Sequence, residues 1–164
     1  MATVAIPQLP PRGITISTLV KTWLFVAVSD MLFASALGMF VPPRVTAARV
    51  FQGVASVLFG KQELAPVGHR ALVGLAMHFG VALFWSSIFL FVLLRSAAVR
   101  TALRDGRGIL IAALYGSAIW LVMSLIVIPA MVHHWPTIGL KYWICLLGHI
   151  PFVAMPMVLV NRGR

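Results

Sequence analysis

The chain has 164 residues, enough for one domain, and 61% of them are hydrophobic while only 10% are charged. Soluble domains have roughly half apolar and a quarter charged residues, and a soluble fold of this size cannot bury so much apolar surface. We therefore expect an integral membrane protein. The net charge of +10 does not indicate a nucleic-acid partner, because nearly all basic residues flank apolar runs, where such residues contact lipid headgroups.

Residues 1–17 are expected to form an irregular N-terminal tail, because prolines and a glycine recur there. The first apolar run, about residues 20–41, reaches the roughly 20 residues that a transmembrane helix needs. Pro42 and Pro43 end this run, and Asp30 interrupts it. An acidic residue fits poorly with the apolar region of a signal peptide, so we interpret the run as a retained span.

The next stretch, about residues 44–60, is shorter and carries Arg44, Arg49 and Gln52. Its apolar residues recur at helical spacing, as Val50, Phe51, Val54, Val57 and Leu58. This pattern is typical of an amphipathic helix that lies in the membrane interface. We favour that interpretation over a re-entrant segment.

Three further apolar runs are long enough to span a bilayer, at about residues 71–94, 108–131 and 138–160. The sequence therefore predicts an all-α membrane protein. Its domain, residues 18–164, is a four-transmembrane-helix bundle with an interfacial amphipathic helix between the first and second spans.

The orientation of the bundle follows from its basic residues. Eight lie on the side of both termini, namely Arg12, Lys21, Arg95, Arg100, Arg104, Arg107, Arg162 and Arg164. Five lie on the other side, namely Arg44, Arg49, Lys61, Arg70 and Lys141. The positive-inside rule then predicts that both termini are cytoplasmic, in a bacterial-type inner (plasma) membrane.

Residues near the ends of the spans are expected to contact lipid headgroups. The cluster Arg95, Arg100, Arg104 and Arg107 is predicted to form a cytoplasmic turn that meets anionic lipid. An aromatic belt is predicted at Trp135, Tyr142 and Trp143, with Trp23 in the same role on the other side.

Three ionisable residues interrupt the predicted spans: Asp30 in the first, His78 in the second and His149 in the fourth. Ionisable groups at such depth are costly and face the interior of a bundle. Small residues accompany Asp30 and His78 at helical spacing, which lets another helix approach closely. Since the spans alternate in direction, the three groups reach similar depths, and a cluster near the midplane is expected.

Prolines in the last two spans add candidate polar groups. Pro151 and Pro156 follow His149, and Pro129 lies near the end of the third span. A proline removes a backbone donor and frees the carbonyl one turn earlier. The carbonyls of Leu147 and Phe152 could therefore line a polar pocket, or the helix could simply be kinked.

No catalytic motif occurs, because the chain lacks a nucleophile elbow, a phosphate-binding loop and an HExxH sequence. An enzyme is therefore not expected, although it is not excluded. His133 and His134 have no carboxylate or cysteine nearby, and adjacent helical residues point in different directions, so no metal site is predicted.

A particular series of residues recurs in one family of membrane proteins. It comprises Asp30, the segment Val50 to Gly60, the segment Gly74 to Phe79, Tyr115-Gly116, Met123, Pro129, His149, Pro156 and Arg162. In this order of features, residues 20–162 resemble a group of small bacterial inner-membrane proteins, loosely YagU-like. The resemblance implies a four-span bundle and points to Asp30, Gln52, His78 and His149 as site residues. It implies no activity, and the proline-containing tail departs from the group.

Three functions stay open on the sequence. The favoured one is a membrane protein of unknown activity whose polar midplane site (Asp30, His78, His149 and Gln52) binds a proton or a small ligand. The second is an accessory or structural subunit, partnered by other membrane subunits or by copies of itself, in which the same residues only hold helices together. The third is an electron carrier that binds haem b through His78 and His149.

Overall fold

A computed structural model describes residues 13–59 and 68–163 of the chain. Most of the predicted tail, including Arg12, therefore lies outside the described residues, as do Lys61, Glu63 and Arg164. Within the described ranges every regular element is a helix and no strand occurs. The prediction of an all-α protein is confirmed.

Four helical segments are long and apolar enough to cross a membrane. They are Ile16–Phe40, His69–Arg95, Gly108–Val132 and Leu140–Asn161. The four predicted spans are confirmed, and their ends differ from the predicted ones by a few residues. The first begins earlier than predicted because Thr15 caps α1 (Ile16–Phe40), its side chain accepting the N–H of Thr18.

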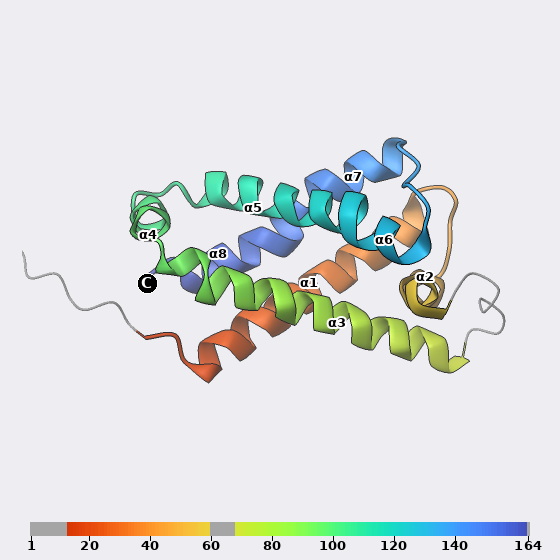
Figure 1. Cartoon of the computed structure of the whole chain (residues 1–164), viewed down its shortest axis with the longest axis horizontal. Coiled ribbons are helices and arrows are strands. Elements are labelled where there is room, and N and C mark those ends of the chain that lie inside the picture. The colour runs from red at the N-terminus through yellow and green to blue at the C-terminus, as the bar shows by residue number, and fades with distance from the viewer. Residues whose placement is uncertain (1–12, 60–67, 164) are drawn as a thin grey trace, which may run out of the picture.

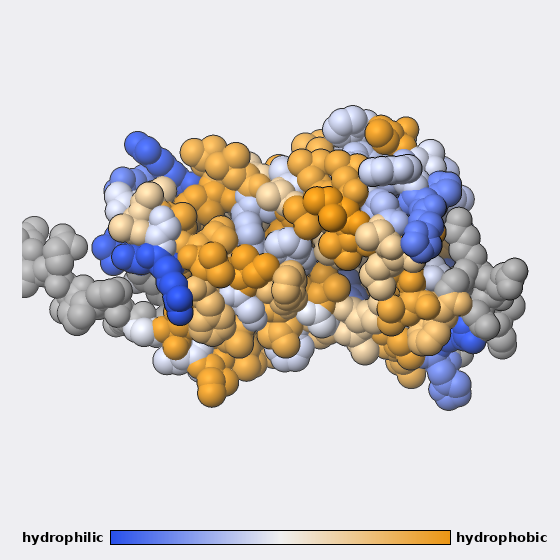
Figure 2. Space-filling view, viewed as in Figure 1, coloured by the Kyte–Doolittle hydropathy of each residue, from blue (hydrophilic) through white to orange (hydrophobic). Residues whose placement is uncertain are grey.

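The four spans pack side by side along the long axis of the molecule (Figure 1). The start of α1, the C-terminus and α4 (Ala97–Arg104) lie at one end of the bundle. At the other end lie α2 (Ala47–Phe59) and the connection from α6 (Ile128–Val132) to α7 (Leu140–His149). Hydrophobic surface covers the middle of the bundle and hydrophilic side chains gather at its two ends (Figure 2). This distribution suits a protein whose middle lies in a bilayer.

Helix α2 runs across the bundle and is seen end-on in Figure 1. It packs on α3 (Gly68–Phe91) and buries Phe51, Gln52 and Ala55. Gly74 of α3 allows this contact, because a Cβ there would lie 2.6 Å from the carbonyl carbon of Phe51 and closer still to its oxygen. The predicted shorter helix between the first two spans is confirmed.

The connection between the second and third spans contains the additional helix α4, where the sequence predicted a turn. After α3 and the short helix η2 (Leu93–Arg95), α4 places Leu103 in the core with no exposed surface. Arg100 donates from Nη1 to the carbonyl oxygens of Leu94 (2.7 Å) and Arg95 (2.8 Å). These bonds satisfy carbonyl groups that the end of a helix leaves unpaired.

The third and fourth spans each contain a π-helical turn directly before a proline. In the third, η3 (Met123–Val127) separates α5 (Gly108–Val122) from α6, and the N–H of Ile128, beside Pro129, bonds to the carbonyl of Met123. In the fourth, η4 (Ile150–Ala154) separates α7 from α8 (Met155–Asn161), and Pro156 follows it. A wider turn relieves the clash between a proline ring and the preceding turn of helix.

The prediction that Pro151 leaves the carbonyl of Leu147 free is wrong. That carbonyl accepts the N–H of Ile150, one residue before the proline. The helix tightens locally and satisfies the group that the missing proline N–H would have bound.

Two aromatic residues predicted in the interfacial belt instead join helices. Trp23 donates from Nε1 to the carbonyl oxygen of Phe79 on α3 over 2.8 Å. Tyr142 is buried, and its hydroxyl lies 3.2 Å from that of Ser124. Trp135 and Trp143 are exposed, at 69% and 54%, as the belt requires. Buried tryptophan and tyrosine find hydrogen-bond partners inside the protein.

Candidate functional site

Asp30 and His78 form a pair between α1 and α3. Each lies near the middle of its helix, and Asp30 Oδ2 is 3.7 Å from His78 Nε2. Both side chains are largely enclosed, with 20% of Asp30 and 12% of His78 exposed. The structure therefore brings together two of the predicted site residues. Between two described residues, this is the single approach within 4.0 Å of a basic and an acidic side chain, and it is ionic when His78 is protonated and Asp30 is not.

The surroundings of His78 fix its ring. Nε2 also lies 3.3 Å from the carbonyl oxygen of Ala27 on α1. A carbonyl oxygen only accepts, so the hydrogen bond requires a proton on Nε2, and Nδ1 is the acceptor of the neutral ring. The rings of Phe51 and Phe79 pack edge-on against the imidazole, with centroids 5.6 and 6.1 Å away. Helix α2 thus covers His78 through Phe51.

His149 has the opposite tautomer. It ends α7, and its Nδ1 lies 2.7 Å from the carbonyl oxygen of Cys145, one turn earlier. Nδ1 must carry the proton of this bond, which leaves Nε2 as the acceptor of the neutral ring. The ring of His149 packs against that of Trp120, with 4.9 Å between centroids, and within the described residues it makes no hydrogen bond or ion pair with Asp30 or His78.

Gln52 lies beside this pair rather than in it. Its side chain is buried on α2, and its Oε1 accepts a hydrogen bond from Arg49 Nη1 over 3.0 Å. Its neighbour Phe51 is the residue that contacts His78. Gln52 therefore belongs to helix α2, which covers His78 through the neighbouring residue Phe51.

A second polar group, which the sequence analysis missed, lies between the third and fourth spans. Trp120 contacts both His149 and Tyr142, and Tyr142 is bonded to Ser124. Within the described residues Trp120 Nε1 is buried and has no hydrogen-bond partner. One sequence signal was available: Trp120 lies at the middle of the third predicted span, where tryptophan is far from the interfaces that it prefers.

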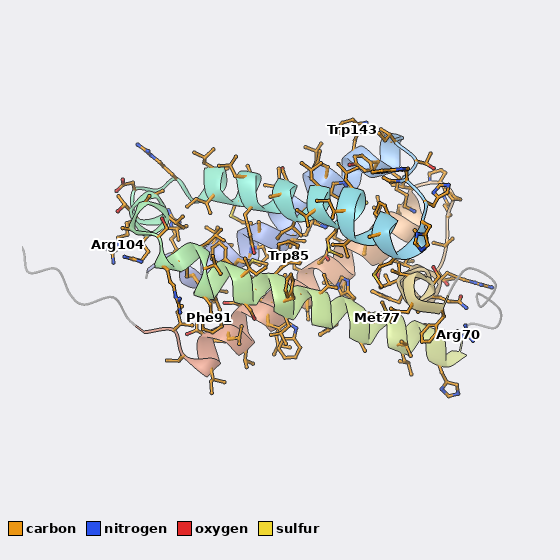
Figure 3. All side chains as sticks on the ribbon, viewed as in Figure 1. Arg70, Met77, Trp85, Phe91, Arg104 and Trp143 are labelled. Atoms are coloured by element: carbon orange, nitrogen blue, oxygen red, sulfur yellow. The ribbon has the colours of Figure 1, made fainter. Side chains whose placement is uncertain are left out.

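The four predicted lipid-contacting arginines separate into two kinds. Arg100 is partly buried and bonded to backbone carbonyls at the end of η2. Arg95, Arg104 and Arg107 are exposed. In Figure 3, Arg104 lies at the opposite end of the bundle from Arg70, with Trp85 between them.

The described residues contain no group of three or more His, Cys, Asp or Glu side chains that could hold a metal ion. A haem between two histidines needs one nitrogen of each ring to face a common gap. His149 has a free Nε2 and an oriented Nδ1, as ligating histidines do. His78 directs Nε2 to Ala27 and Asp30 on α1. This arrangement gives no support to the haem prediction.

The fold and the site define an all-α bundle with four apolar helices of membrane-spanning length and an enclosed carboxylate–imidazole pair. Comparisons of the chain with models of known protein families, with curated proteins and with solved structures find no match. The resemblance to the YagU-like group stays a prediction.

Proposed function

We propose that the chain is an integral membrane protein that binds and releases a proton at the Asp30–His78 pair. The observation that carries this proposal is the 3.7 Å separation of Asp30 Oδ2 and His78 Nε2 in the middle of two neighbouring spans. Ionisable groups within transmembrane segments pair with each other and commonly mark proton or ligand paths.

The pair can hold its proton in two ways. With the proton on the imidazole, Asp30 is a carboxylate beside a cationic ring, and with the proton on Asp30 both groups are neutral. A proton on either group changes the charge that the other group faces across the 3.7 Å separation. A small ligand would need space between Asp30 and His78, and the 3.7 Å separation of Oδ2 and Nε2 leaves none. The short distance therefore favours a proton over a ligand.

The proposal also places the protein in a bacterial-type inner membrane with both termini in the cytoplasm. It is supported by the excess of basic residues on the side of the termini. The start of α1, α4 and the C-terminus lie at the same end of the bundle (Figure 1), as this orientation requires.

Infrared difference spectroscopy over a pH titration tests the proposal on the whole protein in lipid vesicles. The chain has only three Asp and Glu residues, so the carbonyl band of a protonated carboxylic acid can be assigned by substitution. We expect Asp30→Asn to remove one pH-dependent band. We expect His78→Gln to shift the midpoint of that same band, because the two groups share the proton.

The exposed carboxylate of Asp105, at the end of the bundle, supplies the matched control. Asp105→Asn makes the same chemical change and should leave the band of Asp30 and its midpoint unchanged. If Asp30→Asn removes no pH-dependent band, or if His78→Gln leaves the midpoint in place, the pair does not exchange a proton. The two residues then serve only to join α1 and α3.

A further inference from the structure

The end of the bundle that carries α4 holds several arginines whose guanidinium groups have no partner within the described residues. Arg95, Arg104 and Arg107 are exposed, and in the described parts of the chain their guanidinium groups make no hydrogen bond or ion pair. Asp105 lies between two of them in sequence and is also unpaired within those parts. Each guanidinium offers five N–H donors in a planar fork that matches the oxygens of a phosphate.

The backbone holds two of these arginines in a fixed relation. Arg104 ends α4 and Arg107 precedes α5, with Gly106 between them at φ +79°. The N–H of Arg107 bonds to the carbonyl of Ala102 over 2.9 Å. A glycine at this left-handed position is the usual end of an α-helix. The turn is therefore rigid, and Arg100 fixes the other end of α4 through its two bonds to η2.

Exposed apolar side chains lie directly beside the arginines in sequence. Val92 is 61% exposed close to Arg95, and Ile109 is 71% exposed close to Arg107. Hydrophilic and hydrophobic surface meet at this end in Figure 2, and Figure 3 places Phe91 and Arg104 there together. The surface thus has cationic groups at the end of the bundle and apolar groups next to them, toward its middle. A phospholipid has the same order, with its phosphate at the membrane surface and its acyl chains toward the membrane centre.

We propose that Arg104 and Arg107, on the α4–α5 turn, bind the phosphodiester headgroup of an anionic phospholipid, and that Arg95 of η2 adds positive charge at the same end of the bundle. Charge complementarity selects the headgroup, because in the described residues the exposed cations of this end (Lys21, Arg95, Arg104, Arg107 and Arg162) outnumber its single acidic side chain, Asp105. Arg100 is not a ligand, since its guanidinium already bonds to the carbonyls of Leu94 and Arg95. This site is separate from the Asp30–His78 pair, and either proposal can fail without the other.

Native mass spectrometry of the whole protein released from nanodiscs tests this site. The nanodiscs contain equal amounts of phosphatidylcholine and phosphatidylglycerol, and the measurement is the ratio of the two lipids retained by the protein. We expect the wild type to retain phosphatidylglycerol preferentially. Arg104→Gln with Arg107→Gln should lower this preference on the order of tenfold, since each basic residue contributes about 1 kcal/mol at an anionic surface.

Two further variants make the result specific. Arg44→Gln with Lys141→Gln removes the same charge from the opposite end, where α2 and the start of α7 lie, and should leave the preference unchanged. Arg104→Lys with Arg107→Lys keeps the charge and should keep most of the preference. Equal losses in the two glutamine variants, or a wild type that retains both lipids equally, would overturn the proposal.

Discussion

Replacing Gly74 with alanine should loosen α2 from the bundle. An added Cβ would lie 2.6 Å from the carbonyl carbon of Phe51, where ordinary van der Waals contact begins at 3.4 Å. The obstructing atoms belong to the backbone of α2, so no side-chain rotation relieves the clash. Helix α2 must move away from α3 by roughly 1 Å, because protein interiors leave no free space for an added atom.

The expected cost can be separated into two terms. Overpacking of a tight interior contact costs about 1–3 kcal/mol. Alanine within a helix is more favourable than glycine by about 0.5–1 kcal/mol. We therefore expect Gly74→Ala to reduce the free energy of unfolding by about 1 kcal/mol, and by no more than about 2.5 kcal/mol.

Gly80 supplies the matched control on the same helix. A Cβ there would meet nothing within 4 Å, so Gly80→Ala should gain only the helix-propensity term of about 0.5–1 kcal/mol. Denaturant titrations of both variants in detergent micelles, followed by tryptophan fluorescence, measure the difference. Because the propensity term is common to both, the difference isolates the contact with α2.

Equal stabilities of the two variants would refute this reasoning, because they would show that α2 does not pack against Gly74 as described. A second readout follows from the contact of Phe51 with His78. If α2 moves, the NMR signals of the His78 ring should shift in Gly74→Ala and stay in place in Gly80→Ala.

Three further results are expected. Trp23→Phe should lower the free energy of unfolding by about 1 kcal/mol, because it removes the hydrogen bond to the carbonyl of Phe79. An unchanged denaturation midpoint would show that this bond does not stabilise the protein. Arg100→Gln should cost about 1–2 kcal/mol by freeing two carbonyls at the end of η2, and loss of lipid preference without loss of stability would argue against this capping role. In ¹⁵N spectra of labelled histidine at a pH where the rings are neutral, His78 should carry its proton on Nε2 and His149 on Nδ1; identical tautomers would rule out one of the two geometries.

The spans could be predicted because the residue types at their ends differ from the apolar residues within them. Charged residues and prolines mark where each apolar run stops, and Arg70 and Arg95 border the second run closely. The crosswise helix α2 was predicted for a similar reason, since its apolar residues recur on one face. The ends of a span depend on local sequence alone. The helical form of the span follows from the bilayer, in which backbone polar groups must bond to each other.

Helix α4 and the two π turns were missed for a different reason. Helix α4 has eight residues, mostly small or basic, and its packing depends on the single buried Leu103. The prolines that predicted a kink do not reveal how a helix accommodates them. In both π turns the answer lies in which backbone donors reach which carbonyls, and no side-chain pattern records that choice.

The pairing of Asp30 with His78 was predicted by depth, whereas the position of His149 was not. Depth follows from counting along a helix, but rotation about the helix axis depends on the neighbouring spans. The ring of His149 packs on Trp120, and its Nδ1 donates to the carbonyl oxygen of Cys145. Both partners belong to the last two spans, so the contacts of His149 differ from the predicted cluster with the first two spans.

The pair at Asp30 is poorly explained as a structural bond alone. Helix α1 already joins α3 through the neutral bond from Trp23 to the carbonyl of Phe79, and it joins α8 through Asn161 Nδ2 and Thr22 Oγ1 over 3.1 Å. Neutral bonds of this kind hold helices together without the cost of burying a charge. An ionisable pair about two turns from Trp23 adds that cost whenever it is charged, while joining two helices that are already joined. A role in which the charge itself is used accounts for the carboxylate, whereas an amide at the same position would serve the packing equally well.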